Sequence, residues 1–98
     1  MDMSVSNDAA VHMKRDMEVE NGASIRFFVR YGGCGNIQTG FSLGVAIDEP
    51  VEAAASAESE GVIFYVEDKD SWYFGDRPFY VEWDEAAEEI AFRHGELV

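Results

Sequence analysis

Residues 24–31 read Ser-Ile-Arg-Phe-Phe-Val-Arg-Tyr, and this stretch decides the predicted fold. Apolar side chains recur at every second position of it: Ile25, Phe27, Val29 and Tyr31. In a strand, alternate side chains point to opposite faces, so these four would share one face and the two arginines would lie on the other. The stretch therefore predicts a β-strand with one buried face.

The same period of two recurs further along the chain. Three more stretches alternate and a fourth predicts a short last strand: residues 40–48, 61–67, 78–83 and 90–94. Residues 7–18 predict a helix that Ser6 or Asn7 caps, and residues 49–60, which are acidic and rich in alanine, predict a surface loop. The pattern indicates a single domain over residues 1–98, mainly β with α+β character, in which the N-terminal helix packs on the strands.

An aromatic run lies at Trp72, Tyr73 and Phe74, within a helical turn predicted for residues 68–75. Large aromatic side chains dominate both cores and association surfaces. We expect the run to lie in the core, and an association surface is the alternative.

The composition excludes several classes of protein. The chain has 98 residues with 20 acidic and 7 basic side chains, a formal net charge of −13. Such a chain would be repelled by nucleic-acid backbones and by anionic membranes, so we expect neither as a partner. No signal peptide and no apolar stretch of membrane-spanning length is visible, and one cysteine cannot form an internal disulfide, so we expect a cytoplasmic protein.

The acidity is concentrated in the second half of the chain. Residues 1–49 carry 7 acids and 4 bases, whereas residues 50–98 carry 13 acids and 3 bases. High salt screens the self-repulsion of an acidic surface, so this charge is consistent with a halophilic host. An ordinary solvated face and a docking surface for a basic partner are the alternatives.

Cys34 is the one cysteine and lies between Gly33 and Gly35, in a predicted loop between two strands. Glycines let a backbone approach a bound group closely, and an exposed thiolate can bind metal or act as a nucleophile. The alternative is a small buried residue that fills a tight turn. Thiol catalysis would require His12 or His94 close to Cys34, and the sequence does not indicate that either lies there.

Four motifs occur in an order and at spacings that resemble the HesB/IscA family, the A-type iron–sulfur cluster carriers. They are Ser-Asn-Asp-Ala-Ala at 6–10, Phe-Val-Arg-Tyr-Gly-Gly-Cys-Gly at 28–35, Gly-Phe-Ser-Leu-Gly-Val at 40–45 and Glu-Gly-Val-Ile-Phe-Tyr-Val-Glu at 60–67. The resemblance covers nearly all of residues 4–94. It implies a compact distorted pseudo-barrel or sandwich of short mixed strands, with helices to one side.

The resemblance also implies a site and partners. Iron or an iron–sulfur cluster would be held by Cys34, with Gly33 and Gly35 beside it and His94 as a further ligand. The chain would form a homo-oligomer, a dimer, and would interact with iron–sulfur assembly proteins or recipient apo-proteins. However, the two cysteines of the family's Cys-Gly-Cys motif are absent from this sequence, although clusters require about four thiolate-type ligands.

Two functions follow from the sequence, neither of them enzymatic. The first is a HesB/IscA-like protein of iron–sulfur cluster assembly or iron binding, with Cys34 as the metal or cluster ligand. The alternative is a cofactor-free interaction module that keeps the scaffold and uses its acidic surface to dock a partner.

Overall fold

The computed structural model describes residues 2–31, 41–75 and 77–94. The elements, in chain order, are β1 (Met3–Val5), α1 (Asn7–Asp16), β2 (Ser24–Tyr31), β3 (Phe41–Ile47), β4 (Ala53–Ser59), β5 (Val62–Glu67), the 3-10 helix η1 (Asp68–Tyr73), β6 (Phe79–Asp84) and β7 (Glu89–His94). None of the described helices has the length and apolar character that crossing a bilayer requires.

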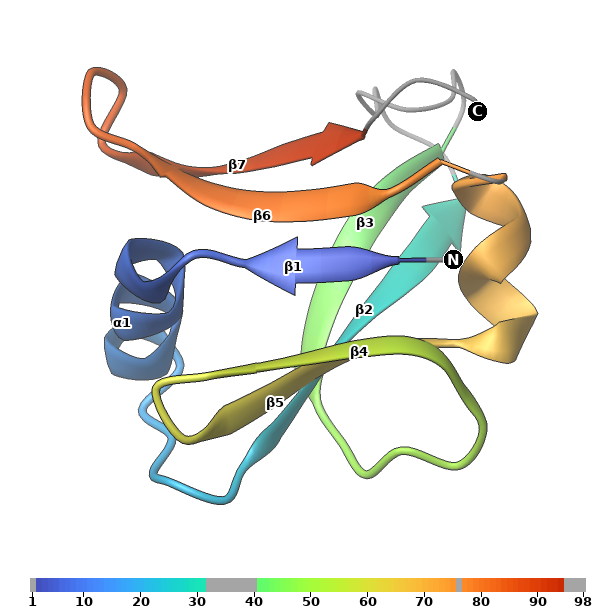
Figure 1. The fold of residues 1–98 in the computed structure, drawn as a ribbon, viewed down its shortest axis with the longest axis horizontal. Helices are drawn as coiled ribbons and strands as arrows, with labels where there is room; N and C mark the ends of the chain where they lie inside the picture. The colour runs from blue at the N-terminus through green and yellow to red at the C-terminus, as the bar shows by residue number, and fades with distance from the viewer. Residues whose placement is uncertain (1, 32–40, 76, 95–98) are drawn as a thin grey trace.

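The strands form two mixed sheets, with the orders β3-β2-β5-β4 and β1-β6-β7 (Figure 1). Parallel pairing joins β2 to β5 and β1 to β6, and the remaining pairs are antiparallel. β1 of one sheet lies beside β4 of the other, so the two sheets adjoin along these strands and enclose a common core. The predicted class, mainly β with α+β character, mixed strands and an N-terminal helix, is confirmed.

The helix α1 begins where the sequence predicts and ends two residues earlier. The hydroxyl of Ser6 accepts a hydrogen bond from the backbone N–H of Ala9 at 3.1 Å, which caps the first turn. Its buried face contains Ala9, Ala10 and Met13. Glu18 has a φ of 54°, in the left-handed region, so the helix cannot continue to residue 18 as predicted.

The core lies on one face of β2 and β5, where the period of two places the apolar side chains. Phe27 is fully buried, and its ring centroid lies 6.2 Å from that of Phe64, 5.6 Å from that of Phe79 and 5.7 Å from that of Phe92. Two aromatics of the run at 72–74, Tyr73 and Phe74, are buried as predicted. Trp72 is not, because 48% of it is exposed.

Two strands were absent from the sequence-based prediction. β1 has only three residues, too few to show a period, and it is defined by its parallel pairing with β6. β4 replaces most of the predicted loop at 49–60: its small side chains carry no apolar period, but its backbone pairs with β5 at a sheet edge. The turn that joins β4 to β5 has positive φ at both Glu60 and Gly61, as tight hairpins require.

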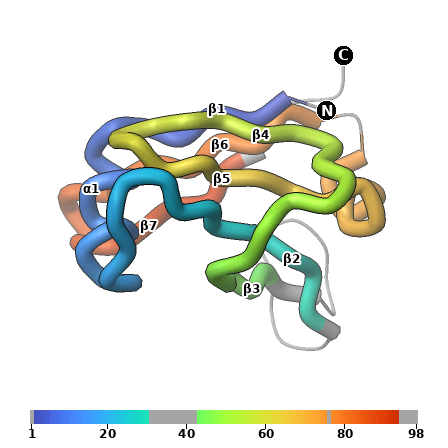
Figure 2. Tube along the Cα trace, turned by 90° about the horizontal axis from the view of Figure 1, so that it is seen from below, coloured from blue at the N-terminus to red at the C-terminus, as the bar shows by residue number. Residues whose placement is uncertain are grey.

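Residues 48–52 connect β3 to β4, the two opposite edges of the same sheet, and we call this segment the strap. It crosses the face of the sheet that is turned away from the core (Figure 2). That face carries Arg26 from β2 together with Tyr65 and Glu67 from β5, since these side chains alternate with those that face the core. The strap therefore covers polar residues that would otherwise face water.

Candidate functional site

The residues predicted to bind a cofactor are not tested by the structure. Cys34, Gly33 and Gly35 fall within residues 32–40, outside the described residues. His94 is the last residue of β7, where its backbone pairs with that of Phe79. The structure does not describe its side chain. Their predicted role as metal or cofactor ligands stays a prediction.

His12, the other histidine considered for thiol chemistry, has a packing role. Its ring stacks on that of Trp83 with the centroids 3.5 Å apart and the planes 9° from parallel. Its Nδ1 lies 2.7 Å from Nη2 of Arg15, within hydrogen-bond distance. The stack joins helix α1 to strand β6, and the indole covers one face of the imidazole.

A metal centre is also not found in the part of the chain that the structure describes. No three His, Cys, Asp or Glu side chains are grouped there so as to hold a metal ion. Side chains with polar chemistry gather instead beneath and beside the strap, on the outer face of the sheet.

Arg26 and Asp70 form the ion pair of this outer face. Nη2 of Arg26 donates to Oδ2 of Asp70 at 2.7 Å, and both side chains are largely buried, with 18% and 11% exposed. The bonded carboxylate raises the pKa of Arg26 above its ordinary value, and burial opposes that rise. The pair ties β2 to the helix η1, 44 residues further along the chain.

The guanidinium of Arg26 also lies over the ring of Phe28, with Cζ 5.5 Å from the ring centroid. The ring is possible in this position because its partner across the ladder is Gly44. A Cβ at Gly44 would overlap the Phe28 ring, so the glycine is required by close approach.

Glu67 holds the strap in place. Only 7% of Glu67 is exposed, and its two carboxylate oxygens each accept a backbone N–H at 3.1 Å, one from Val51 and one from Glu52. The carbonyl of Glu52 in turn accepts the N–H of Asp68 at 2.8 Å. A buried carboxylate is thus satisfied by the backbone of a segment 15 and 16 residues away.

Tyr65 lies on the same face, under the strap, and is fully buried. Its hydroxyl has no hydrogen-bond partner among the described residues. Burial raises the pKa of Tyr65 above its ordinary value, and the nearby charge of Asp48 adds to the rise. Nε of Arg26, on the same face, is likewise buried without a partner among the described residues. Unpartnered buried polar groups are costly, so these two atoms are weak points of the face.

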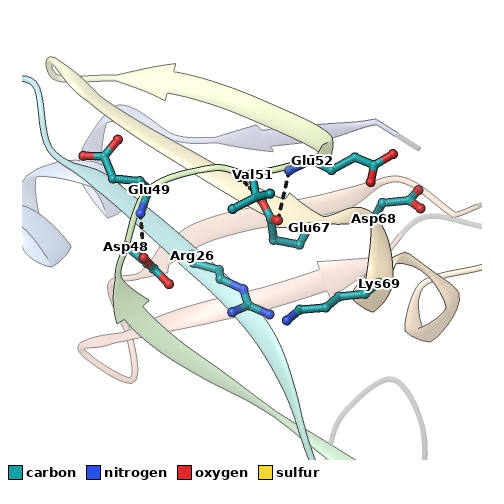
Figure 3. Close-up of a pocket in the computed structure, with 8 residues that line it drawn as sticks. All are labelled: Arg26, Asp48, Glu49, Val51, Glu52, Glu67, Asp68 and Lys69. Atoms are coloured by element: carbon teal, nitrogen blue, oxygen red, sulfur yellow. Dashed lines mark hydrogen bonds between the residues drawn. The ribbon is translucent and has the colours of Figure 1, made fainter.

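A cavity of about 340 Å³ opens between the strap and the start of η1 (Figure 3). Eight residues line it: Arg26, Asp48, Glu49, Val51, Glu52, Glu67, Asp68 and Lys69. Five of these are acids and two are bases, and one of the bases, Arg26, is already paired with Asp70. Charged side chains dominate the described part of this lining, and they suit binding through charge and hydrogen bonds.

Sequence reasoning missed this arrangement, although part of the signal was present. The period of two already places Arg26 and Glu67 on the outer face of their strands, and a charged residue there is ordinarily solvated. Nothing in the local pattern indicates that a connection crosses that face and buries them. The Glu-Pro-Val-Glu at 49–52 marks a connection but not its path.

Relatives of the chain match it along almost its whole length. A protein of Bacillus subtilis named "Pyruvate dehydrogenase inhibitor" is 46% identical over 94 residues, which cover 96% of this chain and 99% of the relative. Two uncharacterized proteins follow, from Staphylococcus saprophyticus at 32% identity and Staphylococcus haemolyticus at 30%. The first match covers 94% of this chain and 97% of the relative, the second 94% and 96%.

No family model and no solved structure matches the chain. The predicted membership of the HesB/IscA family is therefore corrected, because the named relative is an inhibitor of pyruvate dehydrogenase and no match points to cluster carriers. The predicted function in iron–sulfur cluster assembly or iron binding is wrong with it. Its physical weakness was the ligand count, since one cysteine falls well short of the four thiolate-type ligands that a cluster usually has.

The prediction that the chain is not an enzyme is confirmed by the same comparison, because the relative is named for inhibiting an enzyme and not for a catalytic activity. The 46% identity extends over 96% of this chain and 99% of the relative. The chain belongs to the family of the Bacillus subtilis pyruvate dehydrogenase inhibitor.

Proposed function

We propose that this chain is a regulatory binding protein that inhibits a pyruvate dehydrogenase. The observation that carries the proposal is the 46% identity, over 99% of the relative's length, with the Bacillus subtilis protein named as such an inhibitor. This function is a form of the cofactor-free interaction module that the sequence left as the alternative, and its partner is the dehydrogenase rather than the iron–sulfur assembly proteins.

The surface charge supports binding to a large partner. A net charge of −13 on 98 residues produces a long-range field that speeds association with a basic protein surface and resists contact with an acidic one. Inhibition would then be non-covalent: the bound chain would block access to the enzyme or hold it in an inactive arrangement. Such a mechanism needs a stable fold and a shaped surface and needs no cofactor.

Two further predictions from the sequence accompany this function. We expect the chain to act in the cytoplasm, and we expect it to form a homodimer. Light scattering on the purified chain over a range of concentrations tests the second, because a homodimer would give twice the chain's mass of 10.9 kDa.

The direct test is a titration of the purified chain into the Bacillus subtilis pyruvate dehydrogenase complex, followed by pyruvate-dependent formation of NADH. We expect the rate to fall with increasing chain and to level off once the binding sites are filled. The Bacillus subtilis relative is the positive control. An unrelated acidic protein of similar size and net charge is the negative control, because it tests whether charge alone inhibits.

An undiminished rate at a tenfold molar excess of the chain, in an assay where the Bacillus subtilis relative inhibits, would overturn the proposal.

A further inference from the structure

The strap presents an apolar side chain to water. Val51 is 90% exposed, whereas the other exposed large apolar residues of the described chain range from 38% to 58%. Isolated apolar side chains on a surface are ordinary. Val51 differs because the backbone that carries it is held firmly while the side chain itself contributes little to that hold.

The bonds that fix the strap act on its backbone and not on the Val51 side chain. The N–H groups of Val51 and Glu52 are bonded to the buried carboxylate of Glu67, and the carbonyl of Glu52 is bonded to the N–H of Asp68. Pro50 precedes Val51 and restricts the backbone further. A side chain displayed on a pre-ordered segment loses little conformational entropy when a partner covers it.

Acidic side chains surround this apolar point. Asp48, Glu49 and Glu52 lie on the strap itself, and Asp68 lies at the start of η1 beside the cavity (Figure 3). All four are exposed. A second copy of the chain would bring the same negative charges to the contact, whereas a basic protein surface would be attracted, so charge complementarity favours a different protein as the occupant.

We propose that the strap is the docking element of this chain: Val51 inserts into an apolar pocket of the partner protein, and Lys or Arg side chains around that pocket face Asp48, Glu49 and Glu52. The inference rests on the proposed function, because the partner to be tested is the pyruvate dehydrogenase complex. It adds the surface that binds and the chemistry of the surface that receives it.

The first test compares two valine variants for binding to the immobilised Bacillus subtilis complex and for inhibition of its activity. Val51→Asp places a charge at the apolar contact and should weaken binding about tenfold or more, as truncating an anchor residue does. Val11→Asp is the matched control, because Val11 is also exposed, at 47%, but lies on helix α1. It should stay within about twofold of the wild type. Circular dichroism confirms that both variants fold.

The second test separates local charge from net charge. Glu49→Lys and Glu85→Lys change the net charge equally, but Glu49 lies on the strap and Glu85 in the exposed turn between β6 and β7. We expect a loss of about fivefold or more for the strap variant and less than about twofold for the other. Equal losses would mean that only the long-range field acts, and would overturn the charged part of the contact.

The outcomes distinguish this inference from the function on which it rests. If the wild type inhibits and Val51→Asp inhibits equally well, the docking inference is wrong and the function stands. If the wild type neither binds nor inhibits while the Bacillus subtilis relative does, the function is wrong and the inference falls with it. If Val51→Asp instead abolishes self-association and leaves the affinity for the complex unchanged, the occupant is a second copy and our assignment is overturned.

Discussion

The two faces of the β2–β5 pair are built from neighbouring residues in different ways. On the inner face, Phe27 and Phe64 are fully buried among other apolar side chains. One residue away along each strand, Arg26 and Tyr65 lie on the outer face, covered by the strap and by η1. The same two strands therefore carry an apolar core on one face and, on the other, polar side chains held by hydrogen bonds and an ion pair.

The difference lies in what each face requires of the rest of the chain. An apolar side chain is satisfied by any close-packed apolar neighbour, because hydrophobic burial has no direction. Arg26 and Glu67 instead need particular partners at particular positions, the carboxylate of Asp70 and the N–H groups of the strap. The side chains of the outer face are therefore paired only once the strap and η1, which are distant in the sequence, have packed against it.

The largest expected effect compares two adjacent phenylalanines. Phe27→Ala should destabilise the fold by about 3–5 kcal/mol, because it leaves a cavity in the aromatic cluster. Phe28→Ala should cost about 1–2 kcal/mol, because Phe28 is half-buried and contacts Arg26 across the outer face. Urea unfolding measured by circular dichroism gives both values. Equal losses would mean that the inner and outer faces contribute equally to stability.

Removal of a charged partner should have the next largest effect. Asp70→Ala leaves the largely buried Arg26 without its carboxylate and should cost about 2–3 kcal/mol of the free energy of unfolding. Asp68→Ala on the same helix is the control, since Asp68 is exposed, and it should change stability by less than about 0.5 kcal/mol. Similar losses of unfolding free energy for both variants would mean that substitution in the helix, and not loss of the ion pair, causes the destabilisation.

This contrast explains how much of the fold the sequence could predict. The bounds of β2 were predicted without error, and those of β5 to within one residue, because their inner faces carry a period of two that is visible locally. β4 was predicted as part of a loop because residues 49–60 are acidic and rich in alanine with no apolar period, and its structure depends on backbone pairing with β5. Local patterns report burial well and report pairing between segments poorly.

The candidate site depends on pairing of that kind, so the sequence could not supply it. The residues chosen from the sequence were a lone cysteine with its glycines and a histidine, which stand out by type and local setting. The site at the strap consists of ordinary charged residues that become distinctive only where residues 48–52 cross the sheet. A family resemblance by motif order implied iron–sulfur chemistry, whereas the relative matched over 96% of this chain is named as an inhibitor.

A smaller effect is expected from loosening the strap. Glu67→Gln replaces one accepting oxygen by a donor that faces a backbone N–H, and should cost about 1–2 kcal/mol. The amides of Val51 and Glu52 should also exchange with solvent faster, as hydrogen exchange measures directly. Glu58→Gln on the exposed side of β4 is the control and should leave both quantities unchanged. Unchanged exchange at the strap in Glu67→Gln would show that other contacts hold it.

The smallest effect concerns the one hydroxyl that the outer face leaves unpartnered. Tyr65→Phe removes a buried O–H without a partner among the described residues and leaves the ring in place. We expect it to be neutral or to stabilise the fold by up to about 1 kcal/mol at pH 7. A loss of more than about 1 kcal/mol would mean that the hydroxyl is bonded, through water or otherwise.

The pH dependence sharpens this last prediction. Because burial and the charge of Asp48 raise the pKa of Tyr65, the folded state keeps its proton at a pH where the unfolded chain, with an ordinary pKa near 10, loses it. The contribution of Tyr65 to stability is therefore complete below about pH 10 and is lost as the pH rises toward the folded-state pKa. Tyr65→Phe should gain on the wild type across that window, by at most about 1.4 kcal/mol per pH unit. Parallel curves of unfolding free energy from pH 8 to pH 11 would instead show that the hydroxyl ionises as freely in the fold as in the unfolded chain, and that the strap does not seal the outer face as Glu67 and its two bonds indicate.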